Sequence, residues 1–355
     1  MSLFIPKVRF LKKNINNIWY SLFAIYPIAV VSFFNSSKAY RYIDGVGINI
    51  LIYVILAWGL SILVGTTGLL SLNYIIAYAV GAYSYTILGI WYDISPLLLL
   101  PISALIAGLS GVILGLPSLI LRGDLFALIT FTMTEIFQTF LTQKKVLTGG
   151  KSGIYLPDHL MFLGLKIKRV MGFLNLPYSS LYFKIFLYYI LLALCFLSVW
   201  IISKFRSSYT GSILRNIRDN HKSFFKFNTN VVSAKLSAFI VSSILAGACG
   251  ALFATTHGFI APKFFNNSES LIVLSFVILG GMTSFYRIAG VVIVLICSIE
   301  IFCGVNLLGT LLKFDCSVDV RHRTLMIVSL FLVVIVRSYS LSRLRHPSPF
   351  LESKR

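Results

Sequence analysis

The stretch "LTGGKSGI" (147–154) ends in Gly-Lys-Ser, the residues that close a phosphate-binding P-loop. A P-loop has the pattern G-x-x-x-x-G-K-[ST], in which backbone N–H groups surround the phosphates and the lysine reaches the outer ones. Gly150, Lys151 and Ser152 fit this pattern, but its first glycine would fall at position 145, which is Lys145. Nucleotide binding therefore depends on whether the loop joins a strand to a helix in a compartment that holds nucleotides.

A second residue with chemical potential is Glu135, which lies within the apolar run "LFALITFTMTEIFQTFLT" (125–142). At about 100° per residue, Glu135 shares an arc of roughly 140° with four other polar residues. These are Thr130, Thr134, Gln138 and Thr142. The opposite arc is apolar and consists of Leu125, Phe126, Ile129, Met133, Ile136, Phe137 and Phe140.

A carboxylate inside a membrane helix costs about 2.5–3.5 kcal/mol on insertion scales and usually faces a bundle interior or a cavity. Two interpretations of Glu135 follow, and the sequence leaves both open. Either this side chain lines or gates a translocation path, or it is a structural residue whose hydrogen bonds tie two helices together.

The composition shows what kind of fold must hold Glu135 and the Gly-Lys-Ser loop in place. Of 355 residues, 57% are hydrophobic and only 12% are charged, about half the charged fraction of a soluble domain. Too little polar surface remains to coat a water-soluble globule. The sequence therefore predicts an all-α fold, a polytopic bundle of membrane-spanning helices, and the length counts spans rather than domains.

A bilayer core of about 30 Å needs roughly 20 apolar residues in a helix. This rule predicts ten spans within a permease domain at 18–341. They lie near 18–34, 45–64, 70–90, 97–120, 125–142, 181–203, 231–256, 269–285, 287–304 and 324–341. The segments near 70–90 and 269–304 carry enough glycine and polar residues to be broken or re-entrant.

The stretch "VGTTGLLSLNYIIAYAVGAY" (64–83) places Ser71 and Asn73 among glycines and apolar residues. This mixture fits a broken helix, whose free N–H and C=O groups can coordinate a substrate. The other interpretation is a continuous glycine-containing helix packed at an interface. The segment "ILGGMTSF" (278–285) raises the same choice.

Small residues recur every fourth position in two predicted helices. One ridge is Ser103, Ala107, Gly111 and Gly115, and the other is Ala246, Gly250 and Ala254. Such ridges let the backbones of membrane helices approach closely, so they predict a tightly packed bundle and say nothing about a substrate.

The basic residues give the orientation. The net charge is +20, from 31 Lys and Arg against 11 Asp and Glu, and these bases lie mainly between apolar runs. They therefore indicate contact with anionic membrane lipid and not with nucleic acid. The N-terminus (1–17), the loop at 204–230 and the tail (342–355) are basic, which places all three in the cytoplasm.

Residues 143–180 are an exception, because they are also basic but ten spans place them outside. Keeping the count of ten puts Lys151 outside the cell, where no ATP is found. We therefore interpret the Gly-Lys-Ser sequence as a loop that does not bind a nucleotide.

Cysteine and histidine usage argues against metal and disulfide chemistry. The five cysteines are an odd number without a C-x-x-C pair, and the five histidines show no H-E-x-x-H motif. No metal site, no other cofactor and no catalytic residue is predicted. A membrane-embedded enzyme lacks a Ser/His/Asp or metal constellation, so the sequence predicts a protein that is not an enzyme.

The segment "GSILRNIRDNHKSFFKFNTN" (211–230) alternates apolar and charged residues at roughly helical spacing. This pattern predicts a short amphipathic helix at the inner face of the membrane. It is either a headgroup-binding loop or a docking helix for a soluble partner.

Seven pieces of the chain resemble, in order, the permease subunit of branched-chain amino-acid ABC importers of the LivM type. They are "GLLSLNYIIAYAVGAY" (68–83), "TFTMTEI" (130–136), "LTGGKSGI" (147–154), "GSILRNIRDN" (211–220), "KLSAFIVSSILAGACGALFA" (235–254), "GFIAP" (258–262) and "LGGMTS" (279–284). The resemblance covers about residues 45–340, and its strength lies in the order of the pieces.

The resemblance implies a bacterial inner-membrane subunit that pairs with a second, homologous permease. Two ABC ATPase subunits would dock below it and a periplasmic substrate-binding protein above it. Arg215, Ile217, Arg218, Asp219 and Asn220 match the motif that couples to the ATPase. Thr148, Gly149, Gly150 and Gly153 match the external loop, and Glu135 matches the acid of the fifth-segment motif.

Several positions depart from the family pattern. After Asn220 the chain continues with "HKSFFK" (221–226), which is bulkier and more basic than usual, Ile272 stands near a position that is often acidic, and Asn73 replaces a common glycine. These departures bear on how the chain docks onto the ATPase and on which substrate it carries.

The leading hypothesis is a non-catalytic transport subunit for branched-chain or other small polar amino acids. Thr134, Glu135, Gln138, Ser71 and Asn73 are its predicted translocation path. The alternative is a stand-alone, ion-coupled secondary transporter that uses Glu135.

Overall fold

The computed structural model describes residues 26–27, 42–92, 94–121, 124–157, 180–219, 229–304 and 318–345. The predicted basic N-terminus, nearly all of the predicted span at 18–34, most of the loop after Asp219 and the last residues of the tail lie outside these ranges. Asn220 lies outside them as well.

The described chain is helical apart from one pair of two-residue strands. Its first half contains η1 (Ile43–Ile48), α3 (Asn49–Ile62), η2 (Leu63–Thr67), α4 (Tyr74–Tyr92), α5 (Pro96–Gly115), α6 (Pro117–Ile120), α7 (Asp124–Gln143), α8 (Lys145–Thr148), η3 (Gly150–Ser152) and β1 (Ile154–Tyr155). Its second half contains α11 (Ser180–Ser207), α12 (Tyr209–Asp219), α13 (Thr229–His257), β2 (Phe259–Ile260), η4 (Pro262–Phe264), α14 (Asn267–Leu279), α15 (Phe285–Gly304) and α17 (Val318–Arg345).

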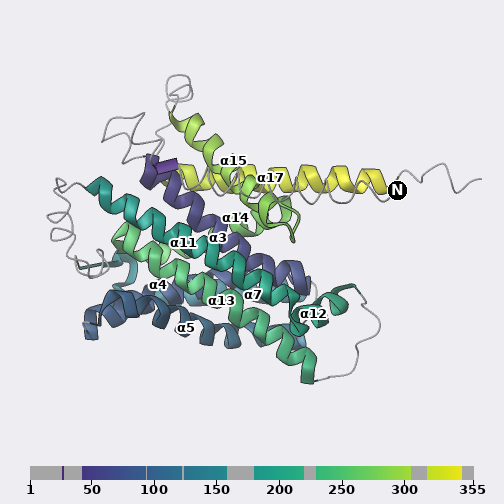
Figure 1. Cartoon of the computed structure of the whole chain (residues 1–355), viewed down its shortest axis with the longest axis horizontal. Coiled ribbons are helices and arrows are strands. Elements are labelled where there is room, and N and C mark those ends of the chain that lie inside the picture. Colours follow the sequence, from purple (N-terminus) through teal and green to yellow (C-terminus); the bar gives the residue numbers. More distant parts are fainter. Residues whose placement is uncertain are drawn as a thin grey trace, which may run out of the picture.

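Six helical segments of the described chain are long and apolar enough to cross a membrane. They are Ile43–Thr67, Tyr74–Tyr92, Pro96–Ile120, Leu125–Gln143, Phe183–Ser207 and Val231–His257. These helices lie side by side with their axes roughly parallel (Figure 1), and they agree with six of the predicted spans. The predicted spans at 287–304 and 324–341 lie within the helices α15 and α17.

The predicted span at 269–285 is wrong as a single helix. The helix α14 has 13 residues and ends at Leu279, which gives a length of about 20 Å against a bilayer core of about 30 Å. The chain turns because Gly281 and Met282 both have left-handed backbone conformations, with φ of 81° and 57°. The helix α15 then begins at Phe285, so this region is a short helix followed by a return, as its glycines indicated.

The broken-helix interpretation of residues 64–83 is confirmed. The π-helical turn η2 ends at Thr67, and Gly68 adopts a left-handed conformation with φ of 72°. Residues 68–73 are not helical, and α4 begins only at Tyr74. We call residues 68–73 the α3–α4 link.

The small residues pack α4, α5 and α13 against one another, as the ridges predicted. A Cβ atom at Gly81 of α4 would overlap the backbone of Gly247 of α13, and one at Gly250 would overlap the carbonyl of Tyr78. Gly111 of α5 faces the Ser243 side chain. Backbones in such close contact leave no room for a methyl group.

We therefore expect Gly81→Ala to lower the melting temperature of the detergent-solubilised chain by several degrees, because α4 and α13 must separate. The control is Gly290→Ala in α15, where no heavy atom lies within 4 Å of the added Cβ. Alanine is the better helix former by about 1 kcal/mol, so the control should melt at the same temperature or higher. Equal melting temperatures for the two variants would contradict this packing.

The bundle has two distinct ends. At one end, β1 pairs antiparallel with β2, and Lys184 near the start of α11 contacts Thr256 near the end of α13. At the other end, Arg206 near the end of α11 contacts Ser61 and Thr283, and α12 follows (Figure 1). We call these the β1–β2 end and the α12 end. The basic stretch at 143–157 and the basic residues after Lys204 thus lie at opposite ends, because the single long helix α11 separates them.

Candidate functional site

The helix α7 exposes polar side chains halfway along its length. Thr132, Glu135 and Thr139 are exposed on one face, and they are flanked by the exposed side chains of Phe131 and Ile136. We call Thr132, Glu135 and Thr139 the α7 polar stripe. In contrast, the exposed residues in the middle of other described spans are apolar: Leu105, Leu109 and Ile113 of α5, Phe196 and Leu197 of α11, and Phe331 and Val334 of α17.

The predicted polar arc of α7 is divided between two environments. Thr130 and Thr134 are buried against the rest of the chain, whereas Glu135 is exposed. Within the apolar arc, Phe126 packs against another helix of the bundle. This side chain is fully buried and lies edge-on to Phe239 of α13, with 6.4 Å between ring centroids.

Among the described residues, the Glu135 carboxylate accepts a side-chain hydrogen bond from Asn267. Asn267 Nδ2 donates a hydrogen bond to Glu135 Oε1 at 2.6 Å, and it also lies 3.4 Å from the carbonyl oxygen of Phe131. This bond supports the structural interpretation of Glu135, and its exposure supports the functional one. Both interpretations therefore apply to the same side chain.

Asn267 begins α14, whose first turn joins four other elements. Ser270 Oγ donates to the carbonyl of Leu72 in the α3–α4 link at 2.7 Å. On another face of the helix, Tyr53 of α3 donates from its hydroxyl to Glu269 Oε2 at 2.9 Å, and His322 Nδ1 of α17 lies 3.1 Å from Glu269 Oε1. We call Asn267, Glu269 and Ser270, with these partners, the α14 junction.

Local sequence explains why α14 begins here. Asn266 has an extended conformation, and its side chain accepts a hydrogen bond from the backbone N–H of Glu269. An asparagine followed three residues later by glutamate is a helix N-terminus signature. The start of the helix thus brings Asn267 to α7, Glu269 to α3 and α17, and Ser270 to the α3–α4 link.

The structure places Ser71 and Asn73 behind α7 rather than on its exposed face. Both side chains are buried, and Ser71 Oγ donates to Asn73 Oδ1 at 2.6 Å. Asn73 Nδ2 donates to the carbonyl of Leu114 in α5 at 3.0 Å. Thr134 donates to the carbonyl of Leu72 at 3.2 Å, so the α3–α4 link and α7 are in direct contact.

Gln138 is half-buried one turn after Thr134. Its backbone carbonyl accepts a hydrogen bond from the hydroxyl of Thr142 at 3.1 Å. Of the predicted path, Thr134, Glu135 and Gln138 therefore lie on one helix, and Ser71 and Asn73 support that helix from the bundle interior.

The predicted external loop forms a compact turn at the β1–β2 end. Gly149, Gly150 and Gly153 all have positive φ, and Cβ atoms at Gly149 and Gly153 would overlap backbone oxygens. The buried hydroxyl of Thr148 donates to the carbonyl of Lys144 at 2.8 Å. Glycine is needed here because its missing Cβ allows this left-handed backbone.

The loop does not have the order of a P-loop. A P-loop follows a strand and opens a helix, whereas here α8 comes first, the 3₁₀ turn η3 contains Lys151 and Ser152, and β1 follows. The side chains of Lys151 and Ser152 are exposed. The structure thus supports the interpretation that this Gly-Lys-Ser sequence does not hold a nucleotide.

The predicted amphipathic segment forms α12 at the end of the bundle (Figure 1). Leu214 is buried and Arg215 is exposed, so one face packs on the bundle and the other points outward. Gly211 lets the start of α12 approach closely, because a Cβ there would lie 2.5 Å from the carbonyl oxygen of Phe205. The backbone of Ile217, Arg218 and Asp219 continues this helix, and their side chains lie outside the described part of the structure.

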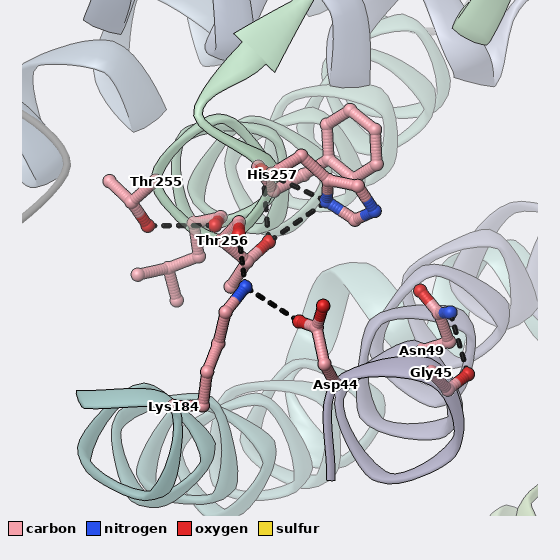
Figure 2. A network of polar contacts seen from close by, with 9 residues as sticks. Asp44, Gly45, Asn49, Lys184, Thr255, Thr256 and His257 are labelled. Atoms are coloured by element: carbon pink, nitrogen blue, oxygen red, sulfur yellow. Dashed lines mark hydrogen bonds and ion pairs between the residues drawn. The ribbon is translucent and has the colours of Figure 1, made fainter. Parts of the chain in front are cut away.

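A polar network around the buried Lys184 at the β1–β2 end was missed from the sequence. Figure 2 shows Lys184 reaching between α11, η1 and the end of α13. Lys184 Nζ donates to Asp44 Oδ1 at 2.6 Å and to the carbonyl of Thr256 at 2.5 Å. The Nδ1 atom of His257 lies 3.1 Å from the hydroxyl oxygen of Thr256.

One other buried base bonds to a carbonyl at the end of a helix, α6, and one half-buried base bonds to a carbonyl in the turn between α14 and α15. Lys235 of α13 donates to the carbonyl of Ser118 at 2.7 Å, and Arg206 donates to the carbonyl of Thr283 at 2.6 Å. The last carbonyls of a helix lack partners within the helix and carry partial negative charge, so a cation there is stabilising. Lys184 and Lys235 lie inside predicted spans, where a lone base is a sign of a functional or structural site, but the sequence does not show their partners.

We expect Lys184→Met to destabilise the solubilised chain by about 1–3 kcal/mol, the range for a buried group that loses its partner. Asp44 and the carbonyl of Thr256 would then lose the same cation. The double variant Asp44→Asn with Lys184→Met should melt at a higher temperature than Lys184→Met alone, because the uncompensated carboxylate is removed. A double variant that melts lower, at the sum of both single losses, would contradict this pairing.

Taken together, the parallel apolar helices and the carboxylate within α7 define a multi-pass helical membrane protein with a polar face on one span. Comparison with known proteins makes this specific. A profile of the branched-chain amino acid transport system permease component family matches residues 42–336. The chain belongs to this family of transport permeases.

Two known permease proteins, both named LivM, are similar to this chain. The chain is 35% identical over 266 residues to the high-affinity branched-chain amino acid transport system permease protein LivM of Escherichia coli, and 34% identical to LivM of Salmonella typhimurium. Each match covers 72% of this chain and 62% of the relative. The chain thus spans about three fifths of the length of the relatives it matches. No solved structure matches significantly.

Proposed function

We propose that this chain is the permease subunit of an ATP-binding-cassette importer and forms half of a path for branched-chain or other small polar amino acids. The observation that carries this proposal is the α7 polar stripe. An exposed glutamate in the middle of an apolar helix would face lipid at a cost of about 2.5–3.5 kcal/mol. A second, homologous permease that covers α7 removes this cost and encloses a polar path between the two subunits.

The two ends of the bundle then face different partners. The α12 end faces the cytoplasm, where Arg215, Ile217, Arg218, Asp219 and Asn220 contact one of two ABC ATPase subunits. The β1–β2 end faces the periplasm, where the turn at 148–153 receives a substrate-binding protein. The chain lies in a bacterial inner membrane with both termini in the cytoplasm, and its basic ends bind anionic lipid.

The packing of α12 supports this role in coupling. Its buried face rests on the bundle near η2 and α13 while Arg215 points outward. Arg206, which directly precedes it, bonds to Ser61 of α3 and to Thr283 between α14 and α15. A displacement of α12 is therefore transmitted through Arg206 to α3 and to the turn that joins α14 and α15. The chain itself hydrolyses nothing, since ATP is consumed on partner subunits.

The alternative is an ion-coupled secondary transporter, and Glu135 is the observation that favours it. Intramembrane carboxylates serve as proton or ion relays in such transporters. In that case the chain would need no ATPase, and the exposed α7 face would contact either lipid or a second copy.

Reconstitution separates the two functions. Proteoliposomes that contain the complete complex should accumulate leucine when ATP is enclosed with the ATPase subunits and the binding protein is outside. The purified chain alone, given a proton or sodium gradient, should accumulate none. Accumulation by the chain alone, driven by an ion gradient, would overturn the importer proposal.

A further inference from the structure

A cavity of about 310 Å³ lies beside the α14 junction, on a different face of α14 from Glu135. It is lined by residues of η4, of the first turns of α14 and of the start of α17, and it lies toward the β1–β2 end. Its volume is at the lower limit of small-molecule sites, which span roughly 300–1,000 Å³. One small molecule fits this space.

Charges of both signs line this cavity. Lys263 and Arg323 are exposed at its walls, and Glu269, whose side chain is only 15% exposed, forms another wall. The nearby N-terminus of α14 adds partial positive charge. Two cations and one carboxylate match the two charges of a zwitterion, because the cations attract a carboxylate and Glu269 attracts an ammonium group.

Glu269 is held in position for such contact. The hydroxyl of Tyr53 donates to one carboxylate oxygen at 2.9 Å, and Nδ1 of His322 lies 3.1 Å from the other. Each carboxylate oxygen can accept a second hydrogen bond, so acceptor capacity remains for a ligand. A carboxylate fixed in this way binds without paying to order its own side chain.

The rest of the lining combines the polar residues Asn266, Ser268 and His322 with three apolar side chains. Phe264, Ile272 and Met326 line the cavity between the charged groups, and Ile272 is buried. The apolar side chain of Ile272 therefore adds hydrocarbon surface at this wall. An aliphatic side chain fits against the surface that these three apolar side chains provide.

We propose that this cavity binds a free α-amino acid with an aliphatic side chain, whose carboxylate lies at Lys263 and Arg323 and whose ammonium group lies at Glu269. The proposal rests on the importer function and adds a binding site on this chain, separate from the α7 polar stripe. Asn267 and Glu269 belong to the same helical turn, so the ligand in the cavity and the bond to Glu135 share one rigid element.

The test is binding of radiolabelled L-leucine to the complete complex in nanodiscs, without the binding protein. Glu269→Gln and Arg323→Gln should each weaken binding at least tenfold. Tyr53→Phe should weaken it by a smaller factor, because it only loosens Glu269. The control is Lys144→Gln, which removes an exposed cation at the same end but outside the cavity and outside the turn at 148–153, and it should bind as the unaltered complex does.

Two analogues test the zwitterion directly. Neither 4-methylpentanoate, which lacks the ammonium group, nor 3-methylbutylamine, which lacks the carboxylate, should compete with leucine. Competition by either one, binding unchanged in both Gln variants, or no leucine binding by the complex would overturn the proposal. Phospholipid that co-purifies with the complex and is lost in both Gln variants, without leucine binding, would instead identify a lipid site and also overturn it.

The same preparations separate this proposal from the importer function. ATP-driven uptake that continues at its normal rate in both Gln variants, with leucine binding unchanged, refutes the site and leaves the importer intact. Leucine binding that depends on Glu269 and Arg323, together with uptake that runs on an ion gradient without ATP, supports the site and refutes the importer. Because Arg323 is exposed, its variant remains informative if Glu269→Gln does not fold.

Discussion

Replacing Glu135 with glutamine is expected to lower ATP-driven leucine uptake at least tenfold while the complex assembles normally. Glutamine keeps a carbonyl oxygen that can accept the bond from Asn267, which is 2.6 Å long in the structure. The substitution therefore removes the charge and preserves the tie between α7 and α14. A tenfold loss corresponds to about 1.4 kcal/mol in the barrier to transport, a modest value for a charge in a path of low polarity.

The reverse substitution provides the control. Asn267→Ala removes the bond to Glu135 but keeps the carboxylate, so it should lower the melting temperature more than it lowers uptake. If Glu135→Gln transports at the unaltered rate and Asn267→Ala does not, Glu135 serves only as a bonding residue. That outcome would remove this side chain from the translocation path.

The second large effect is expected at the α12 end. Arg218→Glu should lower ATP-driven uptake at least tenfold, while the chain remains in the membrane at its normal level. Arg218 lies in the last turn of α12, the helix that points out of the bundle and carries the exposed Arg215. Reversing a charge at a protein interface costs contact and adds repulsion, so the ATPase would no longer engage this helix.

The control for Arg218 lies at the same end of the bundle. Arg287 is an exposed cation at the start of α15 that bonds to Ser284, so Arg287→Glu changes the charge of this end without altering α12. We expect uptake by Arg287→Glu to remain within about twofold of the unaltered complex. Normal ATP-dependent uptake by Arg218→Glu, or an equal loss in Arg287→Glu, would remove the specific role of α12 in coupling.

The fold was largely predictable because the signal of a membrane helix is long and strong. Twenty apolar residues in succession leave few alternatives to a helix, and six predicted spans from 45–64 to 231–256 agree with described helices. The end of the short helix α14 was harder to predict, because Gly280, Gly281 and the polar residues after them indicated a break without fixing the residue at which the backbone turns. Apolarity measures burial and does not show where the backbone reverses.

The polar groups were visible in the sequence, but their partners were not. Glu135 stood out as a lone acid in an apolar run, whereas its bond to Asn267 joins residues 132 positions apart. Glu269, Tyr53 and His322 gave no local sign of meeting, because they belong to three helices that are far apart in the sequence. The exposure of Glu135 could not be predicted at all, since helical periodicity groups residues by face and does not say which face the bundle covers.

The division of α7 into a buried polar side and an exposed polar side has a structural cause. The α3–α4 link lacks helical hydrogen bonds, and its free carbonyl at Leu72 accepts from Thr134 and Ser270. This side of α7 is therefore needed to satisfy the link. The polar residues Thr132, Glu135 and Thr139 remain exposed on the other side of α7.

The most direct test of this account measures what surrounds the α7 polar stripe in the assembled complex. All native cysteines are replaced, and a nitroxide label is placed at Thr139→Cys of α7 or, as the reference for lipid, at Leu109→Cys of α5. Molecular oxygen concentrates in lipid, and a nickel chelate concentrates in water, so their relative collision rates with the label report its surroundings. We predict that Thr139→Cys is shielded from oxygen in the complex and that Leu109→Cys collides with it freely. Equal, lipid-like collision rates at both positions would show that no second permease covers α7 and would contradict the account.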